Sequence, residues 1–174
     1  MDKQIFQSTV KHGVYMGLGF CAYTTLMWLT KLDSTYLSIG QYLDMAIIVL
    51  PLGMILWAIK YAKDAFQISM LQRFVVAIWV AAISTFIYNP FLYLYHHVIN
   101  PNWFNTVLAL KETELRAANS SQELITSTLQ KMQVANQAQS GMFRLSAVIP
   151  SVIVLPILIT LVSFIFIRQK PKQQ

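Results

Sequence analysis

Four long stretches without Asp, Glu, Lys or Arg constrain this chain more than any other feature. They run over residues 12–30, 45–59, 74–110 and 145–167. A helix of about 20 mainly apolar residues crosses the hydrocarbon core of a bilayer. The second stretch is the shortest and reaches that length with help from its flanks, where Asp44 would lie near the positive end of the helix dipole. We therefore predict an all-α fold, an integral membrane bundle of four transmembrane helices. The predicted spans are residues 12–30, 42–61, 74–98 and 145–167.

The composition agrees with lipid as the solvent for these stretches. Charged residues make up 11% of the 174 residues and hydrophobic residues 56%, whereas about 25% of the residues of a soluble domain are charged. We predict one membrane domain over residues 1–174, with the lipid bilayer as its first partner. The net charge of +6 comes from basic residues at the ends of the apolar stretches. The aromatic residues do not lie among them, so we predict no nucleic-acid surface.

The flanking basic residues predict the orientation of the chain. With four spans, one side of the membrane receives Lys3, Lys11, Lys60, Lys63, Arg73, Arg168, Lys170 and Lys172. Cytoplasmic flanks of membrane helices are enriched in Lys and Arg, so we expect the N-terminus, the 60–73 loop and the C-terminus in the cytoplasm. The first stretch is longer than the apolar region of a signal peptide and no small-x-small cleavage site closes it. We therefore expect it to remain as a span.

Residues 100–144 are predicted to form an external helical hairpin between the third and fourth spans. Asn100-Pro101 ends the preceding helix, and apolar residues then recur at helical spacing in two groups separated by Asn119 and Ser120. The tract 130–139 is rich in Gln and Asn and is either a polar helix or partly disordered. Capping boxes are predicted at Ser38–Gln41, Ser69–Gln72 and Ser120–Glu123.

Small residues at a spacing of four predict a close-packing face on two helices. The first helix carries Gly13, Gly17, Cys21 and Thr25, and the third carries Ala77, Ala81 and Thr85. Such faces let helices approach closely, either inside one bundle or between two copies of a chain. Cys21 is the only cysteine, so it forms no intrachain disulfide, and we interpret it as a packing residue.

The outer half of the third span holds the one candidate polar site, made of Asn89, Pro90, His96 and His97. Asn89 stands beside the proline, whose ring frees a carbonyl in the helix. Adjacent helical residues point about 100° apart, so the two histidines cannot easily bind one ion. We predict no metal, no cofactor and no catalytic residues, because neither a third ligand at suitable spacing nor a known catalytic motif occurs.

Several features of the sequence resemble those of known membrane-protein families. Four spans with a long external connection are also found in tetraspanins, but the cysteines of that family's loop are absent. A closer resemblance is to the bacterial domain-of-unknown-function 4199 family. It rests on the Gly-rich segment His12–Gly19, on Pro51-Leu52-Gly53 and on the polar stretch after Asn100-Pro101. This resemblance implies a small protein of the bacterial inner membrane with the same four-span plan and the 100–144 segment in the periplasm; it implies no activity.

Three functions follow from these patterns. The leading one is a non-catalytic assembly, accessory or scaffold subunit that presents the hairpin and binds a second copy or another membrane protein. The alternative is a small transporter or channel component in which Asn89, Pro90 and the outer histidines, His96 and His97, line a path. The third is a membrane enzyme that uses His96 and His97 at the outer interface.

Overall fold

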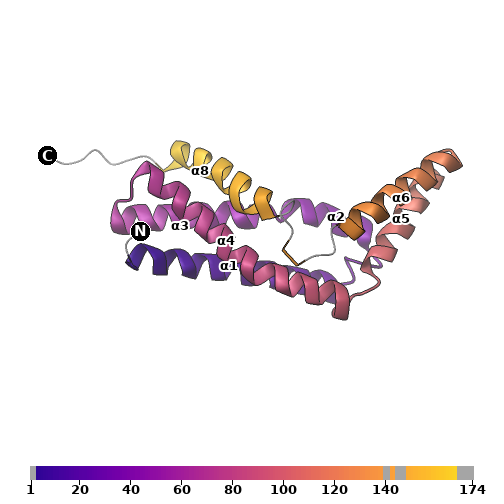
Figure 1. The fold of residues 1–174 in the computed structure, drawn as a ribbon, viewed down its shortest axis with the longest axis horizontal. Coiled ribbons are helices and arrows are strands. Elements are labelled where there is room, and N and C mark those ends of the chain that lie inside the picture. Colours follow the sequence, from indigo (N-terminus) through magenta and orange to yellow (C-terminus); the bar gives the residue numbers. More distant parts are fainter. Residues whose placement is uncertain (1–2, 139–141, 144–147, 168–174) are drawn as a thin grey trace. The chain divides into compact units, whose positions relative to one another are not determined.

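The computed structural model describes residues 3–138, 142–143 and 148–167 (Figure 1). Within these ranges the chain is helical and has no β-strand, which confirms the all-α prediction. The α-helices are α1 (Lys3–Leu29), α2 (Leu37–Ala46), α3 (Val49–Phe66), α4 (Met70–Leu94), α5 (Trp103–Ala117), α6 (Gln122–Ala138) and α8 (Leu155–Phe166). Two π-helices, η1 (Tyr95–Ile99) and η2 (Pro150–Val154), precede α5 and α8.

Among the described residues, two helical stretches are long and apolar enough to cross a membrane. They are Leu37–Phe66 and Met70–Ile99, each of 30 residues. Pro150–Phe166 is a shorter apolar helix, and residues 145–147 of the fourth predicted span lie outside the described ranges. The first predicted span, residues 12–30, lies in helix α1 (Lys3–Leu29) except for its last residue.

The second predicted span is interrupted between α2 and α3 at Ile47 and Ile48. The cause is Pro51 in the first turn of α3. Proline has no N–H to donate, and its ring clashes with the carbonyl four residues earlier, which here belongs to Ile47. Asp44 consequently lies near the end of α2 and not at the start of a span as expected. Its carboxylate accepts a hydrogen bond from the hydroxyl of Tyr23 at 2.9 Å.

The predicted capping box at the start of α4 is confirmed. The Ser69 N–H donates to Oε1 of Gln72 at 2.7 Å, and the Gln72 N–H donates to Oγ of Ser69 at 3.3 Å. These reciprocal bonds satisfy two N–H groups that a helix start leaves without partners. Gln67 adopts a left-handed conformation (φ 52°) and its N–H donates to the Lys63 carbonyl, which ends α3.

The other two predicted capping boxes are wrong, by two residues at α2 and by one residue at α6. Helix α2 begins at Leu37, and the Tyr36 carbonyl accepts the first hydrogen bonds, so Ser38 lies inside the helix. Ser120 is used at the end of α5, where its N–H donates to the Leu115 carbonyl in a Schellman motif with Asn119 left-handed (φ 53°). Ser121 therefore caps α6, and its Oγ accepts from the Leu124 N–H at 3.3 Å.

The chain divides into two compact units. The first takes its residues from Met1–Cys21, Ala46–Tyr88 and Leu145–Gln174. Its core is built from small and branched apolar side chains of α1, α3, α4 and α8, and α3 packs against α8. The largest members are Ile5, Met16, Ile55, Ile59, Ile68, Val76, Val80 and Ile159.

The second unit takes its residues from Ala22–Met45 and Asn89–Arg144. It contains the turn after α1, helix α2, the π-helix η1 and the contacting pair α5 and α6. Gly40 of α2 lies so close to this turn that an added Cβ would be 2.0 Å from the Leu32 carbonyl oxygen. Only glycine fits at that position, because the obstructing atom belongs to the backbone.

Candidate functional site

The turn after α1 directs a carboxylate into the second unit. Lys31 is left-handed (φ 58°), and the Leu32 N–H donates to the Met27 carbonyl at 2.9 Å. These are the features of a Schellman motif, which ends a helix and reverses the chain. The next residue, Asp33, is buried, with 6% of its surface exposed.

Asp33 is bound by one side chain from the end of the third predicted span, Tyr95, and by one that follows it, Asn100. The Tyr95 hydroxyl and Nδ2 of Asn100 both donate to Oδ2 of Asp33, the latter at 2.8 Å. Nδ2 of Asn100 also lies 3.1 Å from the Tyr95 hydroxyl oxygen. The three side chains therefore form a closed polar cluster, which we call the Asp33 cluster.

The Asp33 cluster is a centre of buried and partly buried hydrogen bonds. Hydrogen bonds to a charged group stabilise a fold by about 1.5–3 kcal/mol each. Oδ1 of Asp33 is buried and has no partner among the described residues. The cluster holds the turn after α1 to η1.

Of the four predicted polar residues of the third span, His96 has a ring contact with a member of this cluster, Tyr95. Asn89 and Pro90 are half-buried in α4, and His96 and His97 lie in η1. Here the Asn100 N–H donates to the Tyr95 carbonyl, the wider spacing of a π-helix.

The two histidines have separate neighbours. The His97 ring stacks on Tyr93 at 4.0 Å, whereas the His96 ring lies 4.7 Å from Trp103 and 5.2 Å from Tyr95. In the part of the chain that the structure describes, no three His, Cys, Asp or Glu side chains gather as metal ligands.

The small residues of α1 lie against α4 within the first unit. A Cβ added at Gly13 would be 2.7 Å from Cβ of Ile83, and one added at Gly17 would be 2.9 Å from Cβ of Ile87. Ala77 and Ala81 are buried in the core of the same unit, and Cys21 and Thr25 are half-buried. The glycine face of α1 is thus occupied by a helix of the same chain.

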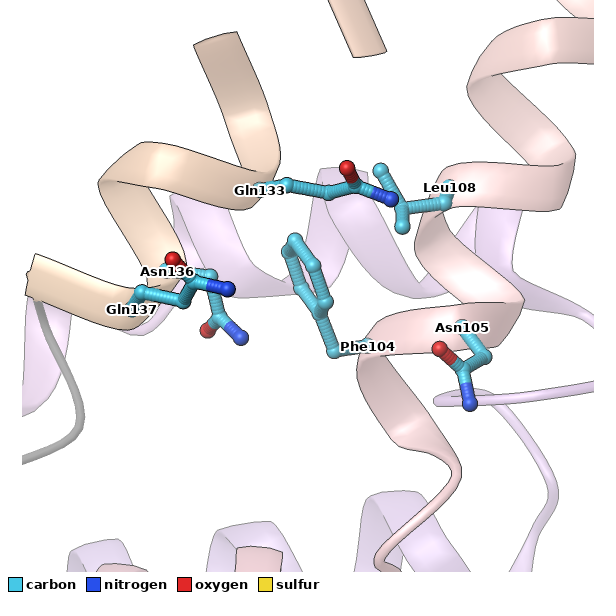
Figure 2. Close-up of a pocket in the computed structure, with 6 residues that line it drawn as sticks. All are labelled: Phe104, Asn105, Leu108, Gln133, Asn136 and Gln137. Carbon is cyan, nitrogen blue, oxygen red and sulfur yellow. The ribbon is translucent and has the colours of Figure 1, made fainter. Parts of the chain in front are cut away.

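A groove of about 300 Å³ lies between α5 and α6. It is lined by Phe104, Asn105, Leu108, Gln133, Asn136 and Gln137. Figure 2 shows the Phe104 ring between the two helices and the Gln133 amide reaching toward Leu108. Carboxamides donate and accept hydrogen bonds without charge, so the groove suits a neutral polar group.

Sequence reasoning did not identify the Asp33 cluster. Asp33 stands 62 residues before Tyr95 and 67 before Asn100, and no spacing rule connects residues so far apart. Asn100 was interpreted only as the end of a helix. The one feature of the sequence that could have pointed to Asn100 was the position of this residue beside the aromatic residues that precede Pro101.

Comparison with known proteins bears out the resemblance seen in the sequence. No curated protein and no solved structure matches the chain. A family profile described as a protein of unknown function, DUF4199, matches residues 11–169. Since this match covers most of the 174 residues, the chain belongs to the DUF4199 family.

Proposed function

We propose that this protein is a four-span membrane protein with a non-catalytic assembly role, presenting the α5–α6 pair as a helical hairpin outside the cytoplasm. Its membrane would be the bacterial inner membrane, with both chain ends in the cytoplasm. The partner would be a second copy or another membrane protein that contacts the hairpin.

The observation that carries this proposal is the contrast between the surfaces of two groups of helices. On α1, α4 and α8, large apolar side chains such as Leu18, Phe86 and Ile165 remain more than half exposed. Over the fully described helix α5, no large apolar side chain is exposed. Exposed apolar surface on this scale is rare in soluble proteins and is expected where lipid covers it.

The polar surface of the α5–α6 pair supports its position in water. Two ion pairs lie on α5, Lys111 with Glu114 at 2.9 Å and Arg116 with Glu112 at 2.7 Å. On α6, Val134 is 59% exposed and lies about two and a half turns after the buried Ile125, hence on the opposite face. Val134 is therefore the best-placed apolar side chain for a contact with a partner.

Cysteine labelling in whole cells tests the topology. Cys21→Ala removes the native thiol, after which Ala118→Cys reports the α5–α6 turn and Asp64→Cys the end of α3. A membrane-impermeant maleimide is expected to label Ala118→Cys in intact cells and Asp64→Cys only after permeabilisation. The reverse pattern, or equal labelling of both before permeabilisation, contradicts the proposed orientation.

Copurification in mild detergent tests the assembly role. We expect a second copy or a partner to remain bound to the wild-type chain and to be lost from Val134→Lys. Thr126→Lys adds the same charge to another exposed position of α6 and should leave binding intact. A solute flux in vesicles that Asn89→Leu abolishes, with no associated protein, would favour a transporter instead.

A further inference from the structure

Arg73 is the largest fully buried side chain of the described residues, with 1% of its surface exposed. It lies in the first turn of α4 (Met70–Leu94), directly after the capping box of Ser69 and Gln72. From its sequence position it was expected among the basic residues at the cytoplasmic boundary. The structure instead buries it in the first unit, between α4 and the end of α8.

Within the described residues, one nitrogen of the Arg73 guanidinium has a hydrogen-bond partner. Nη1 donates to the Ile167 carbonyl oxygen at 3.1 Å, and the guanidinium carbon lies 5.2 Å from the centre of the Phe164 ring. Nε and Nη2 are buried and have no partner in the described parts of the chain. These two nitrogens form one edge of the guanidinium, and that edge binds two oxygens of an oxyanion side by side.

An arginine buried in this way destabilises the folded state unless an anion binds its unpaired donors. Leaving a charged donor buried and unpaired costs more than its hydrogen bond contributes. Neither of the ion pairs found in the described residues involves Arg73, since both lie on α5. The described residues therefore supply no anion to the buried Nε–Nη2 edge of Arg73.

The surroundings of the Nε–Nη2 edge of Arg73 favour the binding of an anion. The N-terminus of α4 carries the positive end of a helix dipole, which attracts phosphate and other oxyanions. Lys60, Lys63 and Asp64 occupy the last turns of α3, and a short connection joins α3 to α4. These three side chains together carry a net positive charge at this end of the unit. Phe66 and Ile167 both pack against the core there and shield the site from water, which strengthens a charge-assisted bond.

We propose that the Nε–Nη2 edge of Arg73 binds a phosphate group, supplied either by a lipid headgroup or by free phosphate. The inference rests on the proposed function, because the orientation argued above brings Arg73 to the cytoplasmic surface of the membrane, where lipid phosphates lie. The phosphate enters when the end of α8 moves away from α4. The Ile167 carbonyl lies just beyond the last helical residue, Phe166, so this movement leaves the helix intact.

The experiment uses the full-length chain purified in an uncharged detergent. One arm adds inorganic phosphate, with chloride at equal ionic strength as the reference, and measures the midpoint of thermal unfolding. The other arm counts anionic phospholipid molecules that stay bound in native mass spectrometry. A rise in the midpoint with phosphate identifies free phosphate as a ligand, and a retained phospholipid identifies the headgroup.

Substitutions test whether the phosphate binds at the Nε–Nη2 edge of Arg73. Arg73→Lys keeps the charge but loses the two-donor edge, so we expect at least about tenfold weaker binding. Arg116→Gln removes one exposed arginine charge from α5, in the other unit, and should keep binding within about twofold, since exposed charges are screened. Arg73→Met tests whether an apolar side chain of similar length keeps the fold without binding.

Two results overturn the proposal. Wild-type protein that responds no more to phosphate than to chloride and retains no phospholipid has no such site, whether or not the variants fold. Binding that Arg73→Lys leaves unchanged belongs elsewhere on the chain. Phosphate binding in detergent combined with the opposite labelling pattern would leave this site standing and reject the proposed topology, so the two failures are distinguishable.

Discussion

The hydroxyl of Tyr95 donates a hydrogen bond to the carboxylate of Asp33 across 62 residues of sequence. Both side chains are buried in the second unit. This bond joins the turn that ends α1 to the π-helix that follows α4.

Tyr95→Phe is expected to lower the free energy of unfolding by about 1.5–3 kcal/mol, because a buried carboxylate loses one of its two donors. The measurement is thermal unfolding in detergent. Tyr93→Phe is the matched control, since Tyr93 is exposed and stacks on His97 through its ring. In a double-mutant cycle with Asp33→Asn, the two changes should couple by about 0.5–3 kcal/mol; strictly additive effects would show that the bond does not stabilise the protein.

Gly17→Ala is expected to destabilise the first unit by about 1–3 kcal/mol, because overpacking forces backbone or side-chain shifts. The added Cβ would lie 2.9 Å from Cβ of Ile87 and 3.1 Å from the Ser84 carbonyl oxygen. The unfolding midpoint in detergent reports the change. Ile87→Ala should recover little of the loss, because alanine keeps the Cβ at 2.9 Å and removes only the more distant Cγ2 at 3.2 Å.

Gly53→Ala is expected to change the stability in the opposite direction from Gly17→Ala. Gly53 lies inside α3, and nothing stands within 4 Å of a Cβ added there. Alanine should therefore stabilise the helix by about 0.5–1 kcal/mol through its higher helix propensity. If Gly17→Ala and Gly53→Ala moved the unfolding midpoint in the same direction, the close approach of α1 and α4 would be in error.

Ser69→Ala should cost about 1 kcal/mol, because α4 loses the side chain that accepts the Gln72 N–H. Ser38→Ala should have little effect, since Ser38 lies inside α2 and does not cap it. Circular dichroism during thermal unfolding measures both. Equal losses from the two substitutions would contradict the assignment of the helix starts.

The ion pair between Arg116 and Glu112 should contribute little to stability. Its side chains are 56% and 41% exposed, and exposed pairs are typically worth less than about 1 kcal/mol. Arg116→Ala is expected to change the free energy of unfolding by less than about 0.5 kcal/mol and to remove a small dependence on salt. A loss of several kcal/mol would mean that α5 is buried against a partner under the conditions of the measurement.

The α-helical class, the family and the start of α4 were predictable from the sequence because each depends on a local pattern. Apolar runs set where helices form, and the Ser69–Gln72 box acts within one turn. Ser38 and Ser120 were misassigned because the preceding chain reversals, at Lys31 and Asn119, set where the next helix begins. A cap is local, but the turn that positions it also depends on what packs against it, as the Leu32 carbonyl does against Gly40.

The sequence by itself determined which segments prefer an apolar environment and where α4 starts, since neighbouring residues decide both. Only the tertiary structure brought Asn100 and Tyr95 to Asp33, buried Arg73 beside the carbonyl of Ile167, 94 residues away, and set Gly17 against Ile87. The physical reason is that hydrophobic length and capping act within a few residues. Which polar side chain is buried, and which of its atoms lacks a partner, depends on how distant helices pack.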